Sequence, residues 1–90
     1  MYYSSSIKPS CKKTIKKLCK KNSELKKALW NKMQEVIEDP LRYKPLKYDY
    51  SGKRRVHIMK SFVLVFKVYE EANHIEFLKL EHHDDAYKRK

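Results

Sequence analysis

The hydrophobic residues of this 90-residue chain change their spacing at Asp39-Pro40, and no other feature constrains the fold as strongly. Before this point, apolar residues recur every three or four positions, which is typical of one face of an α-helix. After it, the pattern within residues 54–81 has a period of two residues, which indicates β-strands. The sequence therefore predicts mainly helices in the first half of the chain and strands in the second.

Two helices are predicted ahead of Asp39. Pro9 and Ser10 mark the start of the first, with Ser10 as its N-cap, and Asn22-Ser23 separates it from the second. One face of the first helix is apolar, and the other is a run of lysines with no acid among them: Lys8, Lys12, Lys13, Lys16, Lys17, Lys20 and Lys21. The second helix carries a longer apolar stripe, made of Leu25, Ala28, Leu29, Met33, Val36 and Ile37. Because the connection is so short, we expect a helical hairpin whose apolar faces share one core.

Short alternating segments predict the strands of one sheet. They are a weak opening strand within residues 1–7 and three consecutive strands at residues 54–60, 61–69 and 74–81. Residues 42–50 also alternate, but they contain Pro45, so they fit either an edge strand or an extended loop. Consecutive strands joined by short turns predict a mostly antiparallel meander.

The central strand decides which side chains face the helices. Its most apolar row is Phe62, Leu64, Phe66 and Val68, and we expect this row to pack on the helical hairpin. Neighbouring residues in a strand point to opposite faces, so the other face carries Arg55, His57 and Val63 away from the helices. A sheet face without helices is either solvated or a binding surface.

These elements predict an α+β fold in the order β-α-α-β-β-β(-β), with an N-terminal helical hairpin packed on one face of a mostly antiparallel sheet. Residues 1–90 suffice for a single domain with one modest core. No apolar stretch approaches the roughly 20 residues that cross a membrane, and the N-terminus lacks the apolar segment of a signal peptide. We therefore expect a cytoplasmic protein with two reduced thiols, Cys11 and Cys19, roughly 12 Å apart along one helix.

A formal net charge of +11, from 22 Lys and Arg against 11 Asp and Glu, favours a polyanionic partner such as nucleic acid, an anionic membrane or an acidic protein. Lys53, Arg54, Arg55 and Lys60 cluster in one predicted strand, where arginine supplies a planar fork for phosphate. Five tyrosines could stack on unpaired bases: Tyr43, Tyr48, Tyr50, Tyr69 and Tyr87. A solvated basic face, with tyrosines that seal core edges, is the alternative reading.

Histidine and aspartate gather at the end of the chain, in His82-His83-Asp84-Asp85. Adjacent side chains of an extended strand point to opposite faces, and no CxxC or HExxH spacing accompanies them, so we predict neither a metal site nor a cofactor. The residues also contain no nucleophile motif or carboxylate pair that spacing could establish. Residue types and spacing alone leave open whether the chain is an enzyme.

The order of elements, the strand pair RRVHIMKSFVLVFKV and the ending EHHDDAYKR together resemble the RelE/ParE superfamily of toxins, most closely the RelE-like mRNA interferases. The resemblance covers nearly the whole chain. It implies a toxin of a type II toxin–antitoxin system, acting as a metal-independent, ribosome-dependent endoribonuclease that inhibits translation. The implied partners are a cognate antitoxin and mRNA in the ribosomal A site, with no membrane and no cofactor.

The resemblance also implies roles for individual residues. Cleavage proceeds by attack of a ribose 2′-OH on the adjacent phosphate, which needs a proton acceptor, cations and a proton donor. Arg55 and His57 match the groove-facing basic strand, flanked by Lys53, Arg54 and Lys60. The phosphate contacts would come from the basic residues, and His57 would accept a proton. At the tail, the implied catalytic residues are His82, His83, Asp85 and Tyr87.

Two positions depart from the pattern of the family. Arginines of the ribosome-dependent members align with Val63 and near Glu81, so two transition-state cations are replaced here. Two alternatives therefore stay open: a ParE-like toxin that inhibits DNA gyrase, and a basic RNA-binding module without catalysis. The tail histidines and tyrosine favour the endoribonuclease, because ParE-like chains usually lack them.

Overall fold

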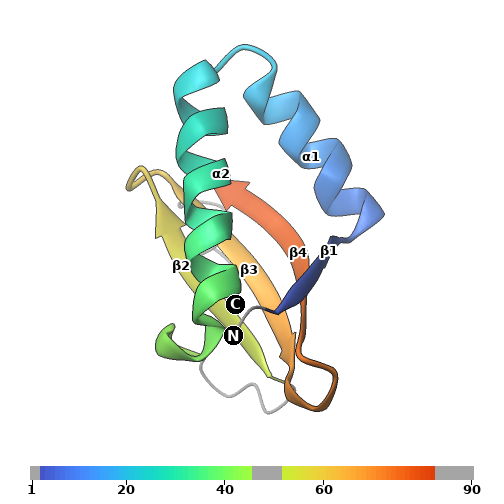
Figure 1. Ribbon diagram of the computed structural model, residues 1–90. Helices are drawn as coiled ribbons and strands as arrows, with labels where there is room; N and C mark the ends of the chain where they lie inside the picture. The colour runs from blue at the N-terminus through green and yellow to red at the C-terminus, as the bar shows by residue number, and fades with distance from the viewer. Residues whose placement is uncertain (1–2, 46–51, 83–90) are drawn as a thin grey trace, which may run out of the picture.

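Two helices lie on one face of a four-stranded sheet in the computed structural model, which describes residues 3–45 and 52–82 (Figure 1). In chain order the elements are β1 (Ser4–Ile7), α1 (Pro9–Cys19), α2 (Ser23–Glu38), β2 (Lys53–Ile58), β3 (Phe62–Tyr69) and β4 (His74–His82). The sheet has the strand order β1-β4-β3-β2; β1 runs parallel to β4, and the other neighbours are antiparallel. The predicted α+β fold is thus confirmed.

The helix boundaries follow from local chemistry. α1 begins at Pro9, with Lys8 as an N-cap that makes no side-chain hydrogen bond, so the predicted N-cap at Ser10 is wrong. Proline suits the first helical position because its φ is already helical and it has no N–H to satisfy. The predicted break before α2 is confirmed: the Leu25 N–H donates to the Asn22 side-chain oxygen at 3.0 Å.

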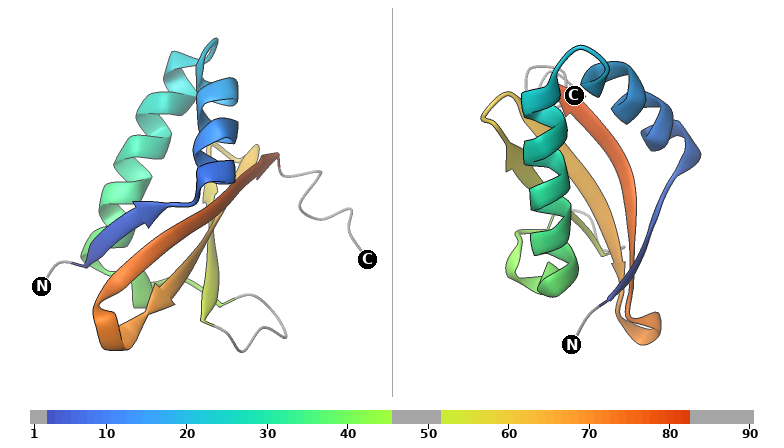
Figure 2. Two further views of the ribbon diagram at one scale, coloured as in Figure 1. Left: turned by 90° about the vertical axis from the view of Figure 1, so that its right-hand side faces the viewer. Right: turned by 45° about the horizontal axis from the view of Figure 1, so that its top comes forward.

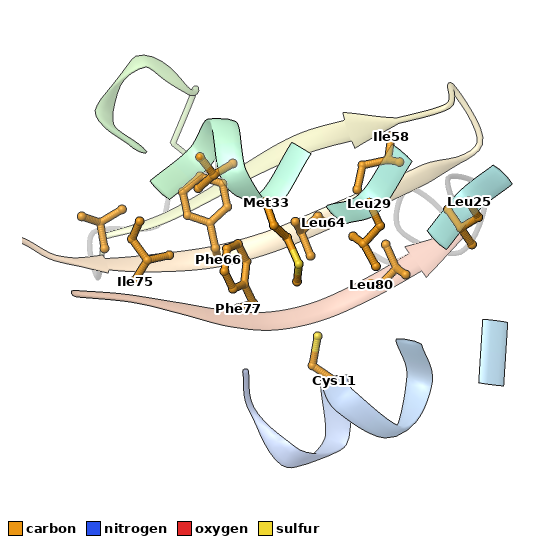
Figure 3. Close-up of a cluster of buried hydrophobic side chains, with 12 residues drawn as sticks. Cys11, Leu25, Leu29, Met33, Ile58, Leu64, Phe66, Ile75, Phe77 and Leu80 are labelled. Carbon is orange, nitrogen blue, oxygen red and sulfur yellow. The ribbon is translucent and has the colours of Figure 1, made fainter. Parts of the chain in front are cut away.

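The predicted inner row of β3 forms the centre of the core. Leu64 and Phe66 are fully buried, and the Phe66 ring packs 6.2 Å from that of Phe77 on β4 (Figure 3). From the other side, Leu29 and Met33 of α2 complete the same cluster. Figure 2 shows that both helices cover this face of the sheet and leave the opposite face without a helix.

α1 contributes less to the core than its spacing predicts. Of its apolar residues only Cys11 is buried, whereas Ile15, Leu18 and Cys19 are half-buried. Both cysteines are free thiols, as expected, and burial raises the pKa of Cys11 to about 11. The common core is therefore built mainly by α2 and the sheet, and part of the apolar face of α1 stays accessible.

A β-bulge in β4 reverses the faces of its last residues. Phe77 lies opposite Phe66, but Lys79 lies opposite Val65, so Leu78 is the extra residue. Before the bulge the odd-numbered residues Ile75 and Phe77 point to the core, and after it Leu80 does. Strict alternation would have turned Lys79 toward the helices; the bulge turns it to the opposite face.

One predicted boundary in the second half is corrected. β2 ends at Ile58, and Met59 and Lys60 lie in the turn with positive φ values of 54° and 64°, so Lys60 is not on the strand. A 3-10 turn spans Pro40–Arg42 at the start of the segment 42–50, and Pro45 makes a single bridge to Arg54. The remainder of that segment lies outside the described residues.

The core predicts that a buried and an exposed aromatic residue differ in their contribution to the free energy of unfolding. Phe66→Ala removes a fully buried ring and leaves a cavity, so we expect the free energy of unfolding to fall by about 3–5 kcal/mol. Trp30→Ala removes a side chain that is 64% exposed and should change it by less than about 0.5 kcal/mol. Urea unfolding followed by circular dichroism measures both. Equal losses in the two variants would contradict this description of the core.

Candidate functional site

The face of the sheet that points away from the helices, called the outer face below, gathers most of the polar residues predicted to bind or react. Strand register assigns its members: Lys53, Arg55 and His57 of β2; Val63, Val65, Lys67 and Tyr69 of β3; His74, Glu76, Lys79 and Glu81 of β4. Ser4 and Ser6 of β1 extend it at one edge. The predicted location of Arg55, His57 and Val63 is confirmed.

Residues of the outer face stand in rows across three strands. His57, Val63 and Glu81 form the row nearest the β2–β3 turn, and Arg55, Val65 and Lys79 form the next. The two valines are only 2% and 5% exposed although they point away from the helices. Each row thus has an apolar floor on β3 between longer polar side chains of β2 and β4.

Basic residues concentrate in the middle of the outer face. Arg55 and Lys79 flank Val65, and Lys53 and Lys67 are direct neighbours in the following row. The sequence reasoning assigned no site role to Lys67 or Lys79. Alternation along β3 already put Lys67 on this face, whereas Lys79 reaches it only because of the bulge. These four cations can hold consecutive phosphates of an extended polyanion.

The two acidic residues assigned to the outer face form an ion pair and a hydrogen bond with neighbouring side chains. The Lys79 Nζ lies 3.3 Å from the Glu81 carboxylate, whose side chain is 13% exposed. Two rows away, the Tyr69 hydroxyl donates to the Glu76 carboxylate at 3.0 Å, and this hydrogen bond raises the pKa of Tyr69. The Lys67 Nζ lies 4.9 Å from the centre of the Tyr69 ring.

His74 ties the edge strand to the sheet at the far end of the outer face. Its Nδ1 lies 2.7 Å from the Ser4 hydroxyl and its Nε2 lies 2.8 Å from the Ser6 hydroxyl. Both serines belong to β1, which pairs with β4 at this point. Because both ring nitrogens are engaged by β1, these contacts indicate a structural role for His74.

Arg54 lies on the helix side of the sheet, unlike Arg55. It is opposite Phe66, and its Nη1 donates to the Tyr43 carbonyl at 2.6 Å. Tyr43 itself packs edge-on against Phe66, which is the core-sealing alternative considered for the tyrosines. This location indicates that Arg54 holds the segment after α2, and its phosphate contact stays a prediction.

The predicted tail residues are not all brought to the outer face. His82 lies opposite Phe62 on the helix side, with ring centroids 5.5 Å apart, and so points away from His57. His83, Asp85 and Tyr87 lie outside the described residues. Among residues 3–45 and 52–82, no group of three His, Cys, Asp or Glu side chains could hold a metal ion. None of the helices in this part is long and apolar enough to cross a membrane.

The helical layer carries two further surfaces. Its lysines are exposed, and in the described part of the chain none of those from Lys8 to Lys21 is paired with an acid. Between α1 and α2 lies an apolar hollow of about 290 Å³, lined by Ile7, Lys12, Ile15, Lys16, Cys19, Lys26, Leu29, Trp30 and Met33. Lysine ammonium groups therefore surround an apolar floor.

Comparison with known proteins decides the family. Residues 6–87 match the family described as the ParE toxin of type II toxin–antitoxin systems, parDE. This chain belongs to the RelE/ParE superfamily of toxins. A relative named RelE4, from Methanocaldococcus jannaschii, is 42% identical over 88 residues, which cover 98% of this chain and 94% of the relative.

Solved structures of RelE toxins share the fold. A mutant of E. coli RelE in the free state has a TM-score of 0.78 at 22% identity, with 98% of this chain and 90% of that chain covered. A chain of the intact E. coli RelBE toxin–antitoxin complex has a TM-score of 0.73 at 22% identity, with 89% and 94% covered. These similarities confirm the architecture expected of a RelE/ParE toxin.

The two departures from the RelE pattern turn out to be neighbours. Val63 and Glu81 are directly opposite each other on β3 and β4, both on the outer face. In this member of the superfamily, a valine and a carboxylate therefore occupy the row where the resemblance places two arginines. His57 is the third member of that row.

Proposed function

We propose that this chain is the toxin of a type II toxin–antitoxin system and cleaves mRNA on the ribosome, so that translation stops. The observation that carries the proposal is the outer face, where four cations and His57 stand together on a RelE/ParE fold. Lysine and arginine in a row attract the phosphates of a single strand, and the imidazole can transfer a proton near neutral pH.

The proposed reaction joins the 2′-oxygen of one ribose to the adjacent phosphorus and releases the 5′-oxygen of the next nucleotide. Negative charge builds up on the phosphate oxygens in the transition state. Arg55 and Lys79 flank the valine floor beside His57, where they would stabilise that charge. His57 would handle one of the two protons that must move.

Tail residues are proposed for the same reaction on the strength of the family resemblance. His83, Asp85 and Tyr87 are expected to act at the chemical step, with Tyr87 stacking on a base or activating the 2′-OH. His82 stays in the proposal as well, although it packs on Phe62 on the helix side of the sheet.

The RelE-like branch is preferred over a ParE-like gyrase inhibitor. The family match carries the name ParE, but the relative with 42% identity is named RelE4. His57 and the basic rows suit RNA chemistry, which gyrase inhibition does not require. The exposed lysines of α1 would add a sequence-independent attraction to ribosomal RNA phosphates.

The decisive experiment is primer extension on translating ribosomes with and without the purified protein. We expect cuts in mRNA that follow the codon phase and appear only with the protein. Inhibition of gyrase supercoiling without RNA cuts would instead identify the ParE-like activity. RNA binding with neither cuts nor growth arrest would identify a module without catalysis.

Arg55 and Arg54 provide a matched pair for testing the RNA surface. Arg55→Ala removes a cation of the outer face, so the affinity for single-stranded RNA should fall and the salt slope of log K should flatten by about 1. Arg54→Ala removes the same charge one residue away on the helix side and should leave the slope unchanged. Fluorescence titration at several salt concentrations measures both, and equal slopes for Arg55→Ala and the wild type would contradict the assignment.

We also propose that a cognate antitoxin docks on the hollow between α1 and α2. One of the solved structures with this fold is described as an intact toxin–antitoxin complex. The hollow has an apolar floor with Trp30 64% exposed beside it, and Lys12, Lys16 and Lys26 line it. Its chemistry fits an amphipathic segment of the antitoxin with apolar residues on one face and acids on the other.

Growth rescue tests this docking site. Trp30→Glu puts a negative charge beside the apolar floor, so the antitoxin should no longer neutralise the variant, and cells that co-express the two should remain arrested. Leu41→Glu changes another exposed apolar residue, 41% exposed and outside the hollow, and should still be neutralised. Full rescue of Trp30→Glu would show that the antitoxin binds elsewhere.

A further inference from the structure

Glu81 is the residue of the outer face that the family pattern does not explain. It stands in the row of His57 and Val63, in a chain where the resemblance places an arginine near this position. A carboxylate cannot replace an arginine in stabilising negative charge. Its presence in the same row as His57 therefore indicates a different chemical role.

We infer that Glu81 and His57 form the acid–base pair of this toxin, with Glu81 as the general base. The inference rests on the proposed function and adds a catalytic residue to it. Both side chains leave the same face of the sheet, one on each side of Val63. Since neighbouring strands are roughly 4.8 Å apart, their Cα atoms are roughly 10 Å apart, which leaves room for a reacting phosphate between the two side chains.

The environment of Glu81 suits its role. The Glu81 side chain is only 13% exposed, and its contact with the Lys79 Nζ at 3.3 Å fixes its direction. An ionised carboxylate can only accept a proton, whereas an imidazolium can donate one near neutral pH. Arg55 and Lys79 stand in the adjacent row, next to the reacting phosphate.

The step balances with these two groups alone. Glu81 accepts the proton of the 2′-OH, the 2′-oxygen forms a bond to phosphorus, and the bond from phosphorus to the 5′-oxygen breaks. His57 donates its proton to that 5′-oxygen. The products are a 2′,3′-cyclic phosphate and a free 5′-hydroxyl, and a proton has passed from the ribose side to the leaving group.

Val63 explains why the pair can work in this chain. It is 2% exposed and carries no charge, so the residue directly opposite Glu81 on β3 does not pair with the carboxylate. An arginine in its place would lie directly opposite Glu81 and would pair with it. The valine and the glutamate are therefore a consistent double change in one row.

Single-turnover cleavage of mRNA on ribosomes tests the pair. Glu81→Gln should reduce the rate constant roughly 100- to 10,000-fold, the usual contribution of a positioned general base, and should abolish the acidic limb of the pH–rate profile. Glu81→Asp keeps the carboxylate and should retain that limb at a reduced rate. His57→Asn should abolish the alkaline limb instead.

Glu76→Gln is the matched control, because it removes one negative charge from the same strand and face. It should cleave at the wild-type rate. Glu81→Arg restores the charge of the family pattern, and we expect it to be inactive; cleavage by Glu81→Arg at or above the wild-type rate would overturn the pair. So would an unchanged pH profile in Glu81→Gln, which is the result expected if Glu81 only holds Lys79.

The outcomes separate this inference from the proposed function. If the wild-type protein produces no cuts, the endoribonuclease assignment fails and the pair fails with it. If the wild type cuts in codon phase and Glu81→Gln is equally active, only the pair is refuted. Circular dichroism of each variant excludes loss of the fold as the cause of lost activity.

Discussion

The packing of the inner row of β3 against α2 is the contact on which the rest of the molecule depends. Leu64 and Phe66 are completely buried there, together with Phe77 of the neighbouring strand. Because successive residues of a strand point to opposite faces, fixing this row also fixes which residues form the outer face. The candidate site is thus a direct consequence of the hydrophobic core on the other side of the same strands.

The bulge in β4 changes which residues of that strand lie on the outer face. If Leu78 were paired like its neighbours instead of forming the bulge, alternation from Ile75 and Phe77 would bring His82 to the outer face and turn Lys79 and Glu81 toward the helices. With it, Leu80 joins the core, and Lys79 and Glu81 complete the rows of Arg55 and His57. A local irregularity of the backbone therefore selects which charged residues can meet an RNA phosphate.

Different surfaces of this RelE/ParE chain suit different partners. The outer face combines fixed cations with groups that can move protons, which suits a reacting strand. The α1 lysines pair with no acid of residues 3–45 and 52–82, and the hollow beside Trp30 is apolar with a lysine rim. An acidic, amphipathic antitoxin could therefore occupy the helical layer through a surface that takes no part in the proposed chemistry.

The sequence by itself determined the order of elements, the helical break at Asn22 and the inner row of β3, because these depend on local periodicity and capping. It also assigned Arg55 and His57 to the face away from the helices. Only the tertiary structure showed that Arg54 donates to Tyr43, turned His82 toward Phe62 and placed Glu81 in the same row as His57. Strand pairing and the bulge at Leu78 decided these positions. The apolar residues shift from odd to even positions at Phe77-Leu78 in the sequence, but only the strand pairing shows that Leu78 is the extra residue.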